Sequence, residues 1–153
     1  MDPLTLALGS DHAGFELKER LKAFLRERGE CFQDFGPPNG EPVDYPDYGI
    51  QVAQAISEGR YQRGILVCGT GIGMSIVANK FRGVRGALCH DLYTARHAKA
   101  HTNANLLILG GRVVGEGLAR EIVATWLDVK FEGGRHERRL EKIAQLEEEM
   151  LSP

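Results

Sequence analysis

Short apolar runs alternate along the chain with segments whose apolar residues recur every three or four positions. Continuous runs of this length are typical of buried strands, and the longer spacing is typical of helices with one buried face. The runs predict five strands, over residues 4–8, 30–35, 65–67, 85–89 and 106–109. The recurring positions predict six helices. The first ends at Gly29, the second covers 45–57, and the third follows Gly73. The fourth runs from Tyr93 toward His101, and the last two cover 115–127 and 135–151.

Strands and helices in strict alternation favour a parallel sheet covered by helices on both faces and joined by right-handed crossovers. A length of 153 residues with 42% apolar content suits a single domain, residues 1–153, with a substantial core. The sequence contains no repeat, low-complexity tract or internal linker. The expected fold class is therefore α/β, in one domain.

Charge and cysteine content narrow the classes of function. A formal net charge of −2 argues against nucleic acid or a membrane surface as the partner, and no apolar run approaches the roughly 20 residues of a membrane span. The start, Met1-Asp2-Pro3, lacks the features of a secretion signal. The three cysteines are an odd number and have no CxxC spacing, which argues against a disulfide framework. A reduced cytoplasm is therefore expected.

The segment Cys68–Ser75 joins an apolar strand to the start of a helix through a turn with three glycines. Successive glycines allow backbone N–H groups to converge, and a helix N-terminus adds partial positive charge. This field favours a thiolate at Cys68, which makes it a candidate base or nucleophile. The alternative is a small apolar filler, the interpretation we assign to Cys31 and Cys89.

The glycine spacing disfavours nucleotide binding. Gly69, Gly71 and Gly73 lack the GxGxxG pattern and follow the third strand rather than the first. Neither Gly64–Gly69 nor Gly9–Gly14 is followed by the Lys and Ser/Thr of a phosphate-binding P-loop. A smaller anion fits this turn better.

Other polar residues also follow predicted strands, where ligands bind in open parallel sheets. Asp11 and His12 follow the first, Cys68–Gly73 the third, His90 and Asp91 the fourth, and Arg112 the fifth.

Histidines offer weak evidence for a metal. His97 and His101 share a helix face but lack the glutamate of HExxH, and His12, His90 and His136 would be ligands only if the fold brought them together. No metal site is therefore predicted. His101 lies at a helix end, where it suits either acid–base chemistry or a surface or capping role.

Arg135 and Arg139 are four residues apart and point the same way on the last helix. A paired guanidinium face suits a phosphate. The alternative is an ordinary exposed face, with ion pairs to Glu132, Glu137 and Glu141. The preceding Gly133-Gly134 suggests a hinge that swings this helix onto another subunit.

Six segments together resemble the type B ribose-5-phosphate isomerases, of the family that also holds the galactose-6-phosphate isomerase subunits. The resemblance covers nearly the whole chain, in order. The segments are Gly9–Gly14, Asp44-Tyr45-Pro46, Cys68–Gly73, Ala78-Asn79-Lys80, Gly111–Gly115 and Gly133–His136.

The resemblance implies a Rossmann-like three-layer α/β/α fold and interconversion of aldose and ketose phosphates with no cofactor. It also implies a homodimer or homotetramer with shared sites, in which the C-terminal helix packs on a partner subunit. By resemblance, Cys68 is the base, the turn amides form an anion hole and His101 opens the sugar ring. Asp11 and Thr70 are implied to contact the reacting hydroxyls. Phosphate or sugar binding is implied for His12, Arg112, Arg135 and Arg139, and the last two of these would come from a partner subunit. The anion hole comprises Gly69, Gly71, Ile72 and Gly73.

Thr102 departs from the family pattern, in which an asparagine commonly follows the ring-opening histidine. A hydroxyl has a shorter reach and lacks an amide's paired donor and acceptor, so the preferred sugar length stays open. The leading substrates are ribose 5-phosphate and ribulose 5-phosphate. The alternatives are allose or galactose 6-phosphate, a non-catalytic sugar-phosphate-binding subunit and, most distantly, a nucleotide-binding oxidoreductase.

Overall fold

The computed structural model describes residues 5–151 and contains one parallel sheet. The strands lie in the order β2-β1-β3-β5-β4, and every neighbouring pair is parallel. The predicted parallel α/β sheet is therefore confirmed. Its strands are β1 (Leu6–Ser10), β2 (Phe32–Asp34), β3 (Arg63–Cys68), β4 (Gly86–Leu88) and β5 (Leu106–Gly110).

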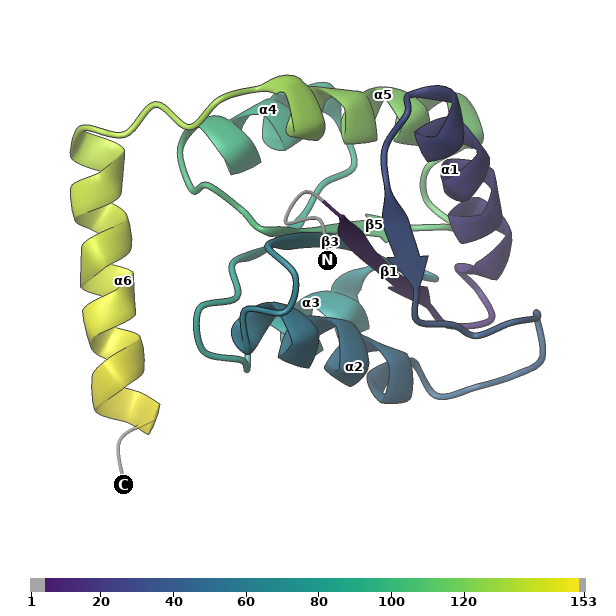
Figure 1. The fold of residues 1–153 in the computed structure, drawn as a ribbon, viewed down its shortest axis with the longest axis horizontal. Helices are drawn as coiled ribbons and strands as arrows, with labels where there is room; N and C mark the ends of the chain where they lie inside the picture. Colours follow the sequence, from purple (N-terminus) through teal and green to yellow (C-terminus); the bar gives the residue numbers. More distant parts are fainter. Residues whose placement is uncertain (1–4, 152–153) are drawn as a thin grey trace.

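Helices cover both faces of the sheet, as the three-layer prediction requires (Figure 1). One face packs against α1 (Phe15–Glu27), α4 (Leu92–Ala100) and α5 (Glu116–Asp128), and the other against α2 (Tyr45–Ser57) and α3 (Ile72–Ala78). Each face has its own apolar core, with Trp126 completely buried in the first and Met74 in the second. The last helix, α6 (Arg135–Leu151), stands off to one side of this sandwich.

The strand ends differ from the sequence prediction for reasons of pairing. The first strand was expected over 4–8, and Leu4 lies outside the described residues. β1 continues to Ser10 because Gly9 and Ser10 pair with Leu66 and Val67 of β3. β2 and β4 are shorter than expected because they are the edges of the sheet, and each pairs over three residues only.

Two helix starts follow local sequence signals. α2 begins after Asp44 with Pro46 in its first turn, where a missing N–H is tolerated. Asp91 caps α4 by accepting the Thr94 N–H over 2.7 Å, so the predicted cap belongs to Asp91 rather than to the His90-Asp91 pair. α3 begins at Ile72, one residue before Gly73 rather than after it.

The strand order places a switch point between β1 and β3. From β1 the chain continues to β2 on one side, and from β3 it continues to β4 on the other side. In open α/β sheets, the crevice at the carboxyl ends of two such strands is the usual ligand site. Among residues 5–151, no helix has the length and apolarity needed to cross a bilayer.

Candidate active site

The turn after β3 holds the Cys68 thiol against a backbone amide. Cys68 is 4% exposed, and Gly71 donates its N–H to the Sγ atom over 3.2 Å. Gly71 has a φ of 81°, which glycine adopts without steric cost, and it caps α3. A Cβ at this position would lie 2.4 Å from Leu88 Cδ1. Glycine is therefore needed here to keep the amide in contact with the thiol.

The rest of the turn is more accessible than the cysteine. Thr70 and Ile72 are exposed, and Ile72 donates its N–H to Thr70 Oγ1 over 3.2 Å. Tyr45 packs so closely on the turn that a Cβ at Gly73 would lie 2.5 Å from its ring. Two of the amides expected in the anion hole, those of Gly71 and Ile72, thus already contact the thiol and the Thr70 hydroxyl. The anion hole itself stays a prediction.

The loop after β1 lies next to this turn. Asp11 is buried, accepts the Gly14 N–H over 2.9 Å and donates its own N–H to Val67 O over 3.2 Å. His12 is exposed, with its Nδ1 atom 3.1 Å from Val43 O. Asp11 is therefore fixed beside the strand that ends in Cys68.

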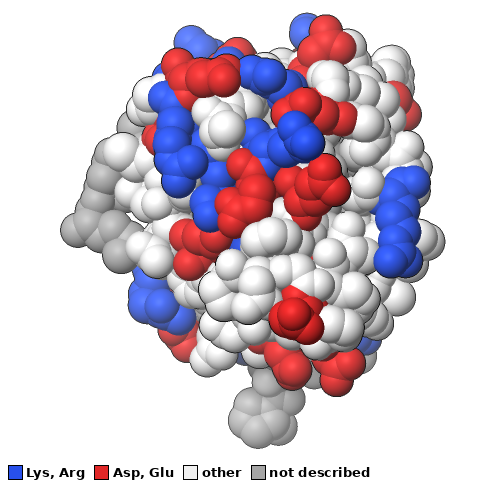
Figure 2. Space-filling model, turned by 90° about the vertical axis from the view of Figure 1, so that its right-hand side faces the viewer, with Lys and Arg blue, Asp and Glu red and all other residues white. Residues whose placement is uncertain are grey.

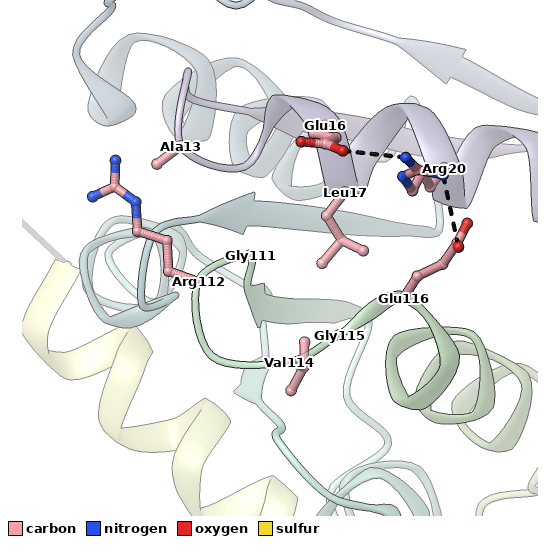
Figure 3. Close-up of a pocket in the computed structure, with 9 residues that line it drawn as sticks. All are labelled: Ala13, Glu16, Leu17, Arg20, Gly111, Arg112, Val114, Gly115 and Glu116. Carbon is pink, nitrogen blue, oxygen red and sulfur yellow. Dashed lines mark hydrogen bonds and ion pairs between the residues drawn. The ribbon is translucent and has the colours of Figure 1, made fainter.

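Arg112 joins the same edge from the loop after β5. Its backbone N–H donates to Gly69 O over 2.9 Å, and its exposed side chain extends toward Ala13 (Figure 3). A Cβ on Gly69 would lie 3.7 Å from Arg112 Nη1, so the guanidinium passes alongside the glycine turn. We refer to these residues as the carboxyl-edge group: Asp11, His12, Cys68–Gly73 and Arg112.

A cavity of about 340 Å³ opens beside Arg112, between α1 and the start of α5. Its other arginine, Arg20, lies 3.2 Å from Glu16 and 3.8 Å from Glu116 (Figure 3). Charges of both signs gather on this side of the molecule (Figure 2). Arg112 has no ion pair among residues 5–151, so it remains available to a phosphate.

The other predicted residues lie elsewhere. His101 ends α4, and Thr102 follows it and donates its hydroxyl to Ala98 O over 2.6 Å. Arg135 and Arg139 begin α6 and are exposed. Neither arginine forms an ion pair within residues 5–151, so the alternative of ordinary pairs to nearby glutamates is not supported. We refer to His101, Thr102, Arg135 and Arg139 as the amino-edge group.

His101 lies in a cluster of aromatic rings. Its ring is stacked on that of His136, with centroids 4.0 Å apart and planes 12° apart, and it forms a T-shaped contact with the ring of His97, with centroids 4.6 Å apart. Glu132 Oε1 lies 3.7 Å from His101 Nε2 and 3.6 Å from His136 Nε2. Burial, together with the nearby His101 and Arg135, lowers the pKa of His136. The sequence interpretation missed Glu132 and His136 as one unit, because Glu132 precedes α6 and no helical spacing links the two residues.

The two groups lie at opposite edges of the sheet. Cys68 pairs with Gly110 at the carboxyl end of β5, whereas His101 precedes Leu106, where β5 begins. The four residue-to-residue steps from Leu106 to Gly110 alone span about 13 Å. Within one subunit, the structure therefore assembles each group but does not bring the two groups together.

The remaining cysteines differ from Cys68 in their surroundings. All three cysteines are free, and burial raises the pKa of the Cys89 thiol to about 11. Cys31 is exposed. A neutral, buried Cys89 agrees with its assignment as an apolar filler, while a reducing compartment stays a prediction.

A parallel α/β sandwich with a cysteine turn and an arginine at its switch point is typical of an enzyme that binds a small anionic substrate. The sequence model of the Ribose/Galactose Isomerase family matches residues 6–143, and the chain belongs to this family. The resemblance found from the sequence motifs is thereby confirmed.

Individual relatives match along almost their full length. The chain is 47% identical to ribose-5-phosphate isomerase B of Escherichia coli, over 94% of this chain and 96% of that protein. It is also 47% identical to D-erythrulose-4-phosphate isomerase of Pectobacterium atrosepticum, over 94% and 95% of the two chains. The solved structure of Clostridium thermocellum ribose-5-phosphate isomerase B has a TM-score of 0.93 at 49% identity, covering 95% of this chain and 99% of that one.

Proposed function

We propose that this protein interconverts ribose 5-phosphate and ribulose 5-phosphate without a cofactor, with Cys68 as the base. The observation that carries this proposal is the contact between the Cys68 thiol and the Gly71 N–H at the carboxyl end of β3. That contact lies beside the Asp11 loop and the Arg112 side chain, which suit the hydroxyls and phosphate of a sugar phosphate. The relatives named ribose-5-phosphate isomerase support this choice of substrate.

The proposed reaction moves two protons, one from C2 to C1 and one from O2 to O1, and shifts the carbonyl double bond from C1 to C2. Cys68 takes the proton from C2 of the open-chain aldose, and the electron pair passes to the C1 carbonyl oxygen, giving an enediolate. The proton then returns to C1 while the O2 hydroxyl proton is transferred to O1, which gives the ketose. Backbone amides of residues 69–73 would stabilise the oxyanion, a contribution of about 3 kcal/mol for each well-placed donor.

The site is proposed to be shared between two subunits. A sugar phosphate bound at Cys68 cannot also contact His101 of the same chain, because the two lie at opposite edges of the sheet. A two-fold assembly that sets the amino edge of one subunit against the carboxyl edge of the other removes this difficulty and creates two equal sites. The partner's His101 would then open the sugar ring, and the partner's Arg135 and Arg139 would bind the phosphate.

The exposed face of α6 supports such an assembly. Its apolar residues Ile143, Leu146 and Met150 are each more than half exposed and recur at helical spacing. Burying such a face against a second subunit would stabilise the pair by about 25 cal/mol for each Å² removed from water. We therefore propose a homodimer, alone or within a homotetramer, in which α6 packs on the partner.

D-erythrulose 4-phosphate is a second candidate substrate. The chain is equally identical to the relative named for that sugar. Thr102 also leaves the preferred sugar length open, because its hydroxyl donates its hydrogen bond to Ala98 O of the preceding helix α4. The six-carbon allose and galactose 6-phosphates remain alternatives from the sequence motifs.

Turnover of sugar phosphates of four, five and six carbons by the purified protein tests the proposal. We expect the highest kcat/KM with ribose 5-phosphate and at least about a hundredfold loss in Cys68→Ser, the usual size of a general-base effect. Cys89→Ser is the matched control, because it changes a buried cysteine that the mechanism does not use, and it should keep activity.

Each part of the proposal can fail separately. A higher kcat/KM with the four- or six-carbon sugar phosphate would contradict ribose 5-phosphate as the preferred substrate but would not contradict the mechanism. Full activity of Cys68→Ser would exclude Cys68 as the base. Binding of ribose 5-phosphate with no turnover of any sugar would revive the non-catalytic alternative.

A further inference from the structure

Within residues 5–151, one cluster of metal-ligating side chains lies outside the carboxyl-edge group. His101, Glu132 and His136 each offer one ligand atom, and these three atoms all lie within 4.8 Å of one another. They come from the end of α4, the connection after α5 and the first turn of α6. The connection is held in place because Glu132 donates its N–H to Ala100 O over 3.0 Å.

His136 is the fixed member of this cluster. It is the buried residue of α6, at 5% exposed, and its Nε2 atom has no hydrogen-bond partner within the described part of the chain. Glu132 Oε1 lies 3.6 Å from His136 Nε2, beyond hydrogen-bond distance. A buried ring nitrogen without a hydrogen bond is unusual and requires an explanation.

We propose that His101, Glu132 and His136 form a binding site for a divalent transition metal of the zinc type, and that its occupation inhibits the enzyme. Two imidazoles and one carboxylate are a known zinc ligand set, with water in the fourth position. Bonds of about 2.1 Å in a tetrahedron place ligand atoms about 3.4 Å apart. The two distances from Glu132 Oε1, 3.6 and 3.7 Å, are already close to this value.

Binding requires one local movement. The rings of His101 and His136 are within 12° of parallel, so they cannot both direct a nitrogen lone pair at one ion. His136 is buried, whereas His101 and Glu132 are 36% and 53% exposed and can turn. His101 therefore rotates toward the ion and leaves the orientation shown in the structure.

Inhibition follows from the role of His101, and this part of the inference rests on the proposed function. A metal-bound His101 cannot exchange a proton with the sugar ring of the partner's substrate. The metal would thus slow the isomerase at the amino edge without touching Cys68. Metal binding itself does not depend on that role.

The binding test uses Co²⁺ and Zn²⁺ alone, added to the intact oligomer. We expect one metal per subunit by calorimetry and a visible Co²⁺ spectrum without sulfur charge-transfer bands. Glu132→Gln and His136→Asn should each weaken binding by at least about tenfold. Glu137→Gln, which removes a charge from a nearby exposed position, and Cys68→Ser should bind as the wild type does.

Activity provides the second readout. Zn²⁺ should inhibit the wild type and Glu137→Gln, and a chelator should restore activity, while Glu132→Gln should resist inhibition. No metal binding, equal binding by Glu132→Gln, or a spectrum with sulfur ligation would overturn the site. Binding at this site without inhibition would overturn the regulatory role. An enzyme inactive on every sugar would refute the proposed function and leave the binding result to be judged separately.

Discussion

Cys68 and His101 lie at opposite edges of one parallel sheet. Cys68 ends β3 and pairs with Gly110 at the carboxyl end of β5, and His101 lies before the amino end of β5. If both act on one sugar, they must come from different subunits. This relationship makes the shared site testable without a structure of the assembly.

Mixing two defective variants should restore activity. In a hybrid of Cys68→Ser and Arg139→Ala subunits, one site carries both substitutions and the other carries neither. Random pairing makes half of the dimers hybrids, so we expect about a quarter of wild-type activity from co-expressed subunits. The measurement is kcat of the mixture against each variant alone.

A same-chain site gives a different result. Every site in the mixture would then carry one substitution, and the mixture would show only the average of the two variants. Co-expression of Cys68→Ser with Cys68→Ser carrying a second tag is the control for assembly. Absence of recovery in confirmed hybrids would contradict the shared site.

Much of the fold followed from local sequence patterns. The approximate bounds predicted for the helices over 45–57 and 135–151 agree with the structure, because proline and glycine mark their starts and apolar spacing marks their length. The alternation of strands and helices was enough to predict a parallel sheet. The order of the strands was not available, because no local pattern shows that β5 lies between β3 and β4.

In the candidate site, too, the features formed by consecutive residues could be predicted from the sequence, and those that depend on the path of the chain could not. The glycine turn at Cys68 and the loop at Asp11 were recognisable because consecutive residues form them. The position of His101 was partly accessible, since a helix between parallel strands returns to the amino edge. The contact of His101 with Glu132 and His136 could not be predicted from the sequence, because that contact depends on the path of the connection from α5 to α6.

Arg139→Ala should lower both affinity and turnover. A guanidinium that binds a phosphate contributes about 1.5–3 kcal/mol, which corresponds to roughly 10- to 160-fold in kcat/KM. Because the phosphate positions the sugar, kcat should fall as KM rises. Arg138→Ala is the matched control on the same helix. Equal kinetics of the two variants would remove Arg139 from the site.

Gly71→Ala should disturb the thiol contact as well as the fold. Alanine at a φ of 81° costs about 1–3 kcal/mol, and its Cβ would press on Leu88. Gly59 has a similar φ of 76°, but a Cβ there meets no atom within 4 Å. Gly59→Ala should therefore lose stability alone, whereas Gly71→Ala should lose kcat too. Urea unfolding and kinetics on both variants separate these effects, and unchanged kcat in Gly71→Ala would contradict the role of this amide.

Asp34→Asn should destabilise the protein in a pH-dependent manner. Asp34 accepts hydrogen bonds from the buried Lys18 over 2.9 Å and from Lys22 over 2.8 Å. Burial alone would raise the pKa of Asp34, but the hydrogen bonds from Lys22 and Lys18 hold it below its ordinary value of 3.8. At neutral pH the loss should be about 2 kcal/mol, the size of a hydrogen bond between charged groups.

The sign of the pH dependence follows from the lowered pKa of Asp34. The unfolded chain takes up the proton first as the pH falls, so the stabilising contribution is complete above the ordinary pKa and is lost below it. The difference in unfolding free energy between wild type and Asp34→Asn should stay constant from about pH 5 to 8 and shrink below about pH 4. Asp128→Asn, at an exposed pair with Arg28, is the control and should have a small effect. A difference that does not shrink in acid would show that the charge on Asp34 is not what stabilises this contact.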